Sequence, residues 1–288
     1  MAAISGGWTC CLRLSGVKHL SEPFRANYHA HTYRCRHAGG TEEDYVRAAL
    51  ESGFSVLGFS DHTPWPYAGD YVSPVRMLPA QLEDYVQTVR ELAARYADRI
   101  RILCGLECEY YPDRIGWLKE QAERFSLDYL LLGHHFSAKG QETLYFGGCR
   151  EEADVRQYVR EVMAGLETGL YAYLAHPDVV LQRFREWTPG LADAMRELCR
   201  AANALRIPLE YNLLGLIYSR RPDHAGQLGY PCRRFWELAA EEGVTAIVGV
   251  DAHQTEHMRQ AAEYDAARAY LSGLGIRLTD TLPLRRPV

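Results

Sequence analysis

The stretch TAIVGVDAH, residues 245–253, joins an uninterrupted apolar run to a polar end at Asp251 and His253. An apolar run without alternation predicts a strand that is buried on both faces, as strands in parallel sheets are. Residues i and i+2 of a strand point to the same face, so these two side chains are expected to aim at one point. The segment therefore predicts a parallel sheet with a polar site at one end.

The same design recurs six more times along the chain. Further strands are predicted at 24–30, 55–61, 100–107, 128–136, 171–176 and 207–212. Helices are predicted between them, near 41–52, 80–97, 151–168, 189–205, 232–242 and 257–272. This alternation predicts a parallel α/β sheet, either closed into a barrel or open and doubly wound. No GxGxxG or GxxxxGK[ST] loop follows a strand, which disfavours an open sheet that binds nucleotides.

Local signals place the ends of several helices. Thr41, three residues before Asp44, predicts a helix start. Gly53, Gly169 and Gly243 each stand where a helix should stop before the next strand. Longer loops are expected at 62–79, 136–150 and 213–231.

No linker rich in proline or glycine divides the chain. We therefore expect a single catalytic domain over 25–288, preceded by an N-terminal extension, residues 1–24, to which we assign no function.

The composition is that of a globular protein, with 47% hydrophobic and 24% charged residues among 288. The net charge of −5 argues against nucleic acid as the main partner. No apolar run approaches the roughly 20 residues of a membrane span, and the N-terminus does not resemble a signal peptide, so we expect a cytoplasmic protein. The eight cysteines form no CxxC pair and are expected to be reduced. The oligomeric state is not predicted.

Side chains that bind metals follow strand after strand, where the carboxyl ends of parallel strands converge. The candidate ligands are His29, His31, His37, His62, Glu107, one of His134 and His135, His176, Asp251 and His253. Nine ligands exceed the four that a zinc ion takes, so two or three ions are expected. Imidazole with some carboxylate favours Zn, Fe or Mn. His19, His224 and His257 have no partner at ligand spacing and are left out.

Taken together, the HxH of the first strand, the histidine six residues later, "GLE", "GHHF", "AHPD" and "DAH" resemble the PHP (polymerase and histidinol phosphatase) superfamily. Within it the chain is most similar to the stand-alone histidinol-phosphate phosphatases, from about residue 25 to about 260. The resemblance implies a distorted (β/α)7 barrel with a trinuclear metal site at the carboxyl ends of its strands. It also implies hydrolysis of a small phosphate monoester, L-histidinol phosphate, in histidine biosynthesis.

The resemblance further implies a role for each ligand. One ion would be held by His29, His31, Glu107 and Asp251, and a second by Glu107 as a bridge with His135 and His176. The third would be held by His37, His62 and His253. Phe136 matches the end of the family's "GxHF" motif and so selects His135 over His134. The segment LEYNLLGL, residues 209–216, resembles one that lies beside the substrate and suggests Asn212 as a substrate contact.

The expected chemistry is attack on phosphorus by water that the metal ions have made more acidic. Glu107, Asp251 and His253 are the predicted catalytic residues, with Asp251 or a strand-end histidine protonating the alcohol that leaves. Asp61 and Asp178 are expected to orient ligand imidazoles. Arg220 and Arg221, in the loop after the sixth strand, are predicted to contact the phosphate.

Two alternatives stay open at the level of sequence. The chain could be a PHP phosphoesterase for another substrate, such as a phosphotyrosine, a sugar phosphate or a nucleotide. It could also be a metal-binding protein without catalytic activity.

Overall fold

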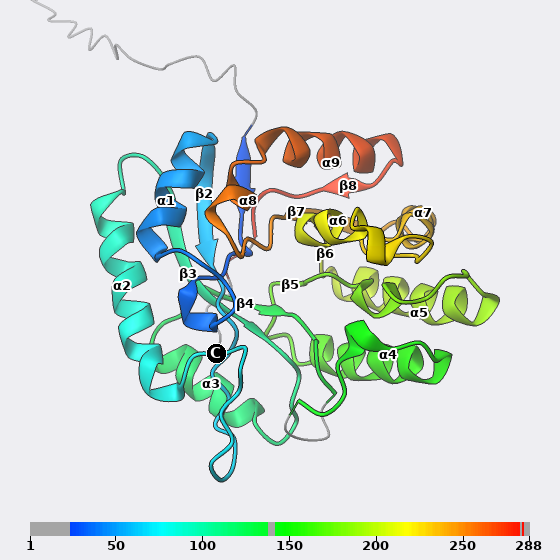
Figure 1. The fold of residues 1–288 in the computed structure, drawn as a ribbon, viewed down its shortest axis with the longest axis horizontal. Coiled ribbons are helices and arrows are strands. Elements are labelled where there is room, and N and C mark those ends of the chain that lie inside the picture. The colour runs from blue at the N-terminus through cyan, green and yellow to red at the C-terminus, as the bar shows by residue number, and fades with distance from the viewer. Residues whose placement is uncertain (1–23, 138–141, 283, 285–288) are drawn as a thin grey trace, which may run out of the picture.

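The computed structural model describes residues 24–137, 142–282 and 284. Eight parallel strands form one sheet in which neighbours in sequence are neighbours in space (Figure 1). They are β1 (Arg25–Asn27), β2 (Phe54–Phe59), β3 (Arg101–Cys108), β4 (Tyr129–Leu132), β5 (Tyr173–Leu174), β6 (Leu209–Asn212), β7 (Thr245–Gly249) and β8 (Arg277–Leu278). The predicted extension, with His19, lies outside the described residues except for Phe24.

The sheet curls until the segments that follow β1 and β7 meet. Ala30 and Ala252 pair in parallel, with the amide of His31 donating to the Ala252 carbonyl at 2.8 Å. The side chain of Asn27 adds a second link, since its Oδ1 accepts from the amide of Val250 at 2.9 Å. Closure at the carboxyl rim confirms the predicted distorted α/β barrel. The short strand β8, which pairs with the start of β7, was not predicted, because two half-exposed residues leave no apolar run in the sequence.

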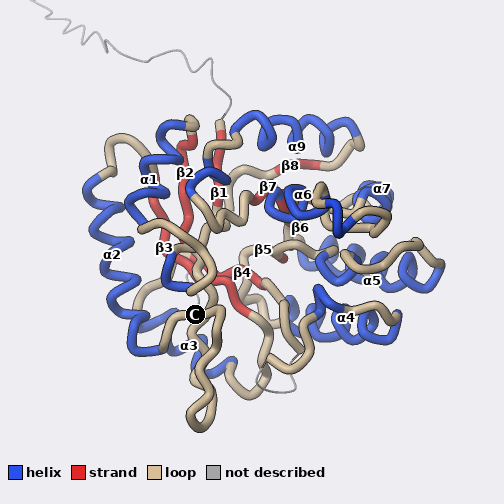
Figure 2. The backbone as a smooth tube through the Cα atoms, in the orientation of Figure 1, coloured by secondary structure: helices blue, strands red, loops and turns tan. Residues whose placement is uncertain are grey.

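Nine helices lie outside the sheet within the described residues, as Figures 1 and 2 show. They are α1 (Glu42–Glu51), α2 (Leu82–Arg95), α3 (Ile115–Arg124), α4 (Glu152–Glu167), α5 (Pro189–Leu205), α6 (Leu213–Ser219), α7 (Arg233–Glu241), α8 (Thr255–Met258) and α9 (Ala261–Gly273). The segments between successive strands, with the longer helices in them, return the chain to the amino end of the sheet, as parallel pairing requires.

The local signals for helix ends are confirmed. Thr41 and Asp44 form a reciprocal capping box at the start of α1. Gly53, Gly169 and Gly243 adopt φ of 71°, 69° and 68°, in the left-handed region that favours glycine.

Two helices were not predicted. Helix α3 buries only Leu118, Gln121 and Ala122, so its apolar periodicity is weak. Helix α6 has seven residues, all but one apolar or glycine, that follow β6 directly, in a stretch expected to be a loop. Its start is fixed by Asn212, whose Oδ1 accepts from the amide of Gly215 at 2.9 Å.

The interior of the barrel is filled by side chains below the rim. Tyr129 on β4 crosses it, donating its hydroxyl to the carbonyl of Tyr28 at 2.7 Å. Gly58 and Gly105 leave room for this ring, since a Cβ at either position would lie 2.3 or 2.7 Å from it. The core is therefore closed beneath the carboxyl rim, and the polar site lies above it. No helix in the described ranges is long and apolar enough to span a membrane.

Candidate metal centre

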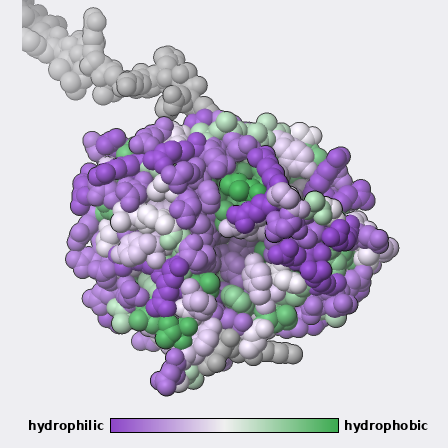
Figure 3. Space-filling view, viewed as in Figure 1, coloured by the Kyte–Doolittle hydropathy of each residue, from purple (hydrophilic) through white to green (hydrophobic). Residues whose placement is uncertain are grey.

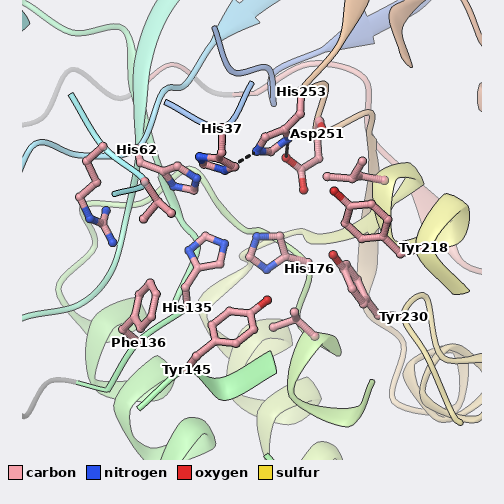
Figure 4. A pocket seen from close by; sticks show the side chains of 14 residues that line it. His37, His62, His135, Phe136, Tyr145, His176, Tyr218, Tyr230, Asp251 and His253 are labelled. Atoms are coloured by element: carbon pink, nitrogen blue, oxygen red, sulfur yellow. Dashed lines mark hydrogen bonds and ion pairs between the residues drawn. The ribbon is translucent and has the colours of Figure 1, made fainter. Parts of the chain in front are cut away.

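The structure brings all nine predicted ligands to the carboxyl rim. His29 and His31 follow β1, His37 lies before α1, His62 follows β2, Glu107 is on β3, His135 follows β4, His176 follows β5, and Asp251 and His253 follow β7. Several of them line a cavity of about 310 Å³ (Figure 4). Figure 3 shows a hollow near the middle of this face, surrounded mainly by hydrophilic residues.

Four of these side chains point one donor atom each at a common centre. Oε2 of Glu107 lies 3.3 Å from Nε2 of both His29 and His31. Oδ1 of Asp251 lies 3.4 and 3.3 Å from the same two nitrogens. All four atoms are buried without a hydrogen-bond partner. Donors that bind zinc tetrahedrally at about 2.0–2.1 Å lie about 3.3–3.4 Å apart, so the spacing fits a divalent ion.

The carboxylate of Glu107 also faces a second group of imidazoles. Its Oε1 lies 2.8 Å from Nε2 of His176 and 3.4 Å from Nε2 of His135. Because its two oxygens face different histidines, Glu107 could hold two neighbouring ions if they were bound. Gly133 makes this possible, since a Cβ there would lie 1.9 Å from Oε1 of Glu107.

His37 and His253 form a third group with His62. Nδ1 of His37 is 2.8 Å from the carbonyl of Cys35, and Nδ1 of His253 is 3.0 Å from that of Asp251. Each Nδ1 therefore carries a hydrogen, which leaves a lone pair on each Nε2. These two Nε2 atoms lie 2.9 Å apart, and a cation between them would relieve their repulsion. The ring of His62 stacks 5.2 Å from that of His37.

The electrostatics of the cluster also favour cations. Burial by itself would raise the pKa of Glu107, but the imidazoles of His135 and His29 hold it well below its usual range. Burial likewise opposes ionisation of Asp251, and the neighbouring His29 keeps its pKa well below normal. The pKa of His37 falls to about 4 because the ring is buried beside His253. Although burial opposes it, Asp251 and Glu107 raise the pKa of His29 well above its usual value and that of His31 to about 9. A divalent ion would take the place of these protons beside the ionised carboxylates.

Backbone geometry at the site is unusual at two of the predicted ligands. His176 and Asp251 have φ of 28° and 51°, in a region that side chains other than glycine rarely occupy. Such conformations persist where the surrounding structure enforces them, and they cluster at functional sites.

Glu210 supports two of the predicted ligands, a role that its position at a strand end did not reveal. It is fully buried and lies 2.9 Å from Nδ1 of His29. It also accepts from the amide of His176 at 3.1 Å. The first contact holds the hydrogen of His29 on Nδ1 and leaves Nε2 free to face the centre. Gly249 leaves the space, since a Cβ there would lie 1.8 Å from Glu210.

We expect Glu210→Gln to weaken metal binding by about 10- to 100-fold, the usual cost of losing the partner of a ligand histidine. The change keeps the shape of the side chain but removes the charge that orients His29. The measurement is a metal titration against a competing chelator. Glu263→Gln, at an exposed ion pair with Arg220, is the matched control and should leave the affinity unchanged. An unaltered affinity in the Glu210 variant would contradict this role.

The structure does not bring the predicted substrate contacts to the cavity lining. Arg220 pairs with Glu263 at 3.1 Å and is largely exposed, and the guanidinium of Arg221 stacks 4.4 Å from the centre of the Tyr218 ring. Both arginines come directly after α6, whose Leu214 and Tyr218 line the cavity instead. Neither arginine lies at the cavity.

Asn212, the third predicted substrate contact, is fully buried and uses its whole amide within the protein. Its Nδ2 donates to Oε2 of Glu210 at 2.9 Å and to Oδ2 of Asp251 at 3.0 Å. Its Oδ1 caps α6. Asn212 therefore positions Asp251 and has no amide hydrogen left to donate to a substrate.

Asp61 and Asp178 were expected to orient ligand imidazoles, but their hydrogen bonds go to other groups. Asp61 accepts from the amide and the hydroxyl of Thr32, and lies 4.0 Å from Nδ1 of His31, beyond hydrogen-bonding distance. Asp178 accepts from the amide of Cys232 at 2.6 Å and so anchors the start of α7.

The rings of His134 and His135 point in different directions. His134 lies 2.8 Å from Glu161 on α4 and accepts from the amide of Tyr110. It therefore faces the helices, and His135 faces Glu107.

Sequence reasoning missed Arg76, which is linked to His135 through Glu109. Arg76, buried in the cavity wall, donates to Glu109 at 2.6 Å, and Glu109 lies 3.4 Å from Nδ1 of His135. A single arginine in a loop carries no sequence signal for such a role.

The fold and the site together define a metal-binding α/β barrel whose chemistry lies at the carboxyl rim. Comparison with known families agrees with this class, since the model of the PHP domain matches residues 27–213. The chain belongs to the PHP domain family.

Among its relatives is a protein of Deinococcus radiodurans named a probable histidinol-phosphatase. It is 31% identical, over 78% of this chain and 85% of its own length. The histidinol-phosphatase of Bacillus subtilis is 25% identical, over 82% of this chain and 96% of its own. A histidinol phosphate phosphatase from Lactococcus lactis, solved with zinc, L-histidinol and phosphate, has the same fold with a TM-score of 0.67. Its identity is 18%, over 88% of this chain and 95% of that one.

Proposed function

We propose that this chain is a metal-dependent phosphatase that hydrolyses L-histidinol phosphate to L-histidinol and phosphate. The observation that carries the proposal is the convergence of nine imidazole and carboxylate side chains, Glu107 among them, at the carboxyl rim, where six of them line one cavity. The names of the relatives from Deinococcus radiodurans and Bacillus subtilis support the substrate. A role in histidine biosynthesis and a cytoplasmic location are part of the same proposal.

Two or three divalent ions are assigned to the nine ligands as follows. The first belongs to His29, His31, Glu107 and Asp251, the second to Glu107, His135 and His176, and the third to His37, His62 and His253. When bound, such ions lower the pKa of a coordinated water and neutralise the charge on the phosphoryl group. The chain itself supplies the fixed tautomers of His29, His37 and His253 and the bridging carboxylate of Glu107.

The rest of the cavity suits a small organic group. Its volume of about 310 Å³ is at the lower end of the range for small-molecule sites. Four aromatic residues line the cavity on the side away from His37, His62 and His253, namely Phe136, Tyr145, Tyr218 and Tyr230 (Figure 4). Aromatic and hydroxyl groups would therefore surround the alcohol part of the ester. L-Histidinol is an amino alcohol with an imidazole ring. Its ring could pack against the aromatic side chains of this lining, and its polar groups could contact the hydroxyls.

The test is phosphate release by the metal-loaded protein from a panel of esters, together with elemental analysis. The panel holds histidinol phosphate, phosphotyrosine, a sugar phosphate and a nucleotide. We expect the highest kcat/KM for histidinol phosphate. Preference for another ester would replace the substrate but keep the class. Bound metal without any hydrolysis would make the chain a metal-binding protein. The Glu107→Gln variant, purified in parallel, controls for contaminating phosphatases.

A further inference from the structure

The cavity has two chemically different sides. Figure 4 shows His37, His62 and His253 on one side, and the hydroxyls of Tyr145, Tyr218 and Tyr230 directed toward the middle from the other. The first side carries the atoms that fit metal ions, and the second carries neutral hydroxyl donors. His176 lies between them, with its ring centre 6.3 Å from that of Tyr230.

This arrangement limits where the alcohol can leave. In phosphoryl transfer the attacking and leaving oxygens lie on opposite sides of phosphorus. Because the attacking water belongs to the ligand side, the leaving oxygen faces the tyrosines. An alkoxide is a poor leaving group, so a proton donor on that side has a large effect on the rate.

Asp251 is poorly placed to donate that proton. Its Oδ1 faces the nitrogens of His29 and His31, and its Oδ2 accepts from Asn212 at 3.0 Å. Oδ1 is therefore directed at the proposed metal site and Oδ2 is occupied as an acceptor, which leaves the hydroxyls opposite as donors.

Tyr230 is the most firmly held of the three tyrosines. Its ring lies on Gly215, where a Cβ would be 2.3 Å from it, and its carbonyl accepts from Oγ of Ser219 at 2.9 Å. The next residues are anchored as well, since the amide of Cys232 donates to Asp178 at 2.6 Å. The whole residue is 6% exposed, whereas Tyr145 is 43% exposed.

The hydroxyl of Tyr230 is free to act. Within the described part of the chain no side chain or backbone group forms a hydrogen bond with it, although it borders the cavity. A phenol has an ordinary pKa of about 10, so the group has a proton to give at neutral pH. A preorganised donor without a protein partner is what a developing alkoxide requires.

We propose that Tyr230 is the catalytic acid, donating its hydroxyl proton to the alcohol oxygen of the ester as the bond to phosphorus breaks. Water forms the new bond to phosphorus and loses a proton, and the breaking bond leaves its electron pair on the alcohol oxygen. That oxygen takes the proton of Tyr230, and the phenolate regains one from solvent. The products are the free alcohol and phosphate. The proposal rests on the proposed phosphatase function and adds a residue to it.

The test compares two kinds of ester in Tyr230→Phe, which removes only a hydroxyl without a partner and should leave the fold and the metal content unchanged. Histidinol phosphate, with an alkoxide leaving group, is expected to lose about 100-fold or more in kcat. p-Nitrophenyl phosphate, whose phenolate leaves without a proton, should lose little. A series of substituted phenyl phosphates should show a steeper dependence on leaving-group pKa in the variant than in the wild type. Tyr96→Phe, at a surface contact with Glu43, is the control.

Equal losses for both esters would overturn the proposal, as would an unchanged kcat for the alkyl ester. These outcomes are separate from a failure of the proposed function. If the wild type prefers another alkyl phosphate, that ester replaces histidinol phosphate in the same comparison and still decides the role of Tyr230. If no ester is hydrolysed, both proposals fall.

Discussion

Replacing Glu107 with glutamine is expected to lower phosphatase activity at least a thousandfold, about 4 kcal/mol of transition-state stabilisation. Glu107 lies within 3.4 Å of nitrogens from His29, His31, His62, His135 and His176. An amide has the same shape but no charge and only one acceptor, so it cannot bridge two ions. Loss of a single outer partner of a ligand already costs 10- to 100-fold, and a shared ligand should cost more.

The measurement combines kcat/KM with metal content per chain. We expect the metal content to fall together with the activity, and the same for His29→Ala and Asp251→Ala. Folding should survive, because the apolar core lies below the rim and is separate from the ligands. Glu43→Gln, on an exposed face of α1, serves as the control. Full metal content and full turnover in the Glu107 variant would disprove the ligand assignment.

Removal of the metal by a chelator is expected to abolish hydrolysis and to lower thermal stability. Ligands that bind only the folded chain stabilise it by about 4 kcal/mol at a thousand times their dissociation constant. The folded state holds the ligand side chains close together, whereas in the unfolded chain they are far apart and bind the metal weakly. For a chain of this size that free energy corresponds to a shift of roughly 7 °C in Tm.

Calorimetry of the chelated and zinc-reloaded protein measures this shift, with activity assayed on the same samples. Reloading should restore both Tm and turnover. A chelated protein with an unchanged Tm and undiminished turnover would mean that the nine side chains do not bind catalytic metal.

The sheet and the ligand candidates were predictable because their signals are local. A buried parallel strand is a continuous apolar run, as 129–132 and 246–250 are, and the polar residue that ends it must lie at the rim. His29 with His31, and Asp251 with His253, come from the alternation of side chains along one strand. Parallel topology then brings the ends of all the strands together.

The contacts of loops and helices were not predictable in this way. Arg220 and Arg221 follow a strand that ends at the site. The direction in which they point depends on the length of the helix α6 that separates them from that strand, and the sequence did not predict this helix. The position of Asn212 at the end of β6 was enough to predict that it lies at the rim. Only the positions of Glu210 and Asp251 show that both hydrogens of its amide are donated within the protein. Arg76 and Glu109 approach His135 from separate segments, with no pattern in the sequence that links them.

The sequence by itself therefore determined the order of strands and helices, the parallel sheet and the set of side chains able to bind metal. Only the tertiary structure decided which oxygen of Glu107 faces which histidine, that His135 points inward while His134 points outward, and that Tyr230 presents a free hydroxyl to the cavity. The physical reason is range. Strand burial and side-chain alternation are set by neighbours a few residues apart, whereas a site of this kind depends on separations of about 3 Å between groups that are far apart in the chain.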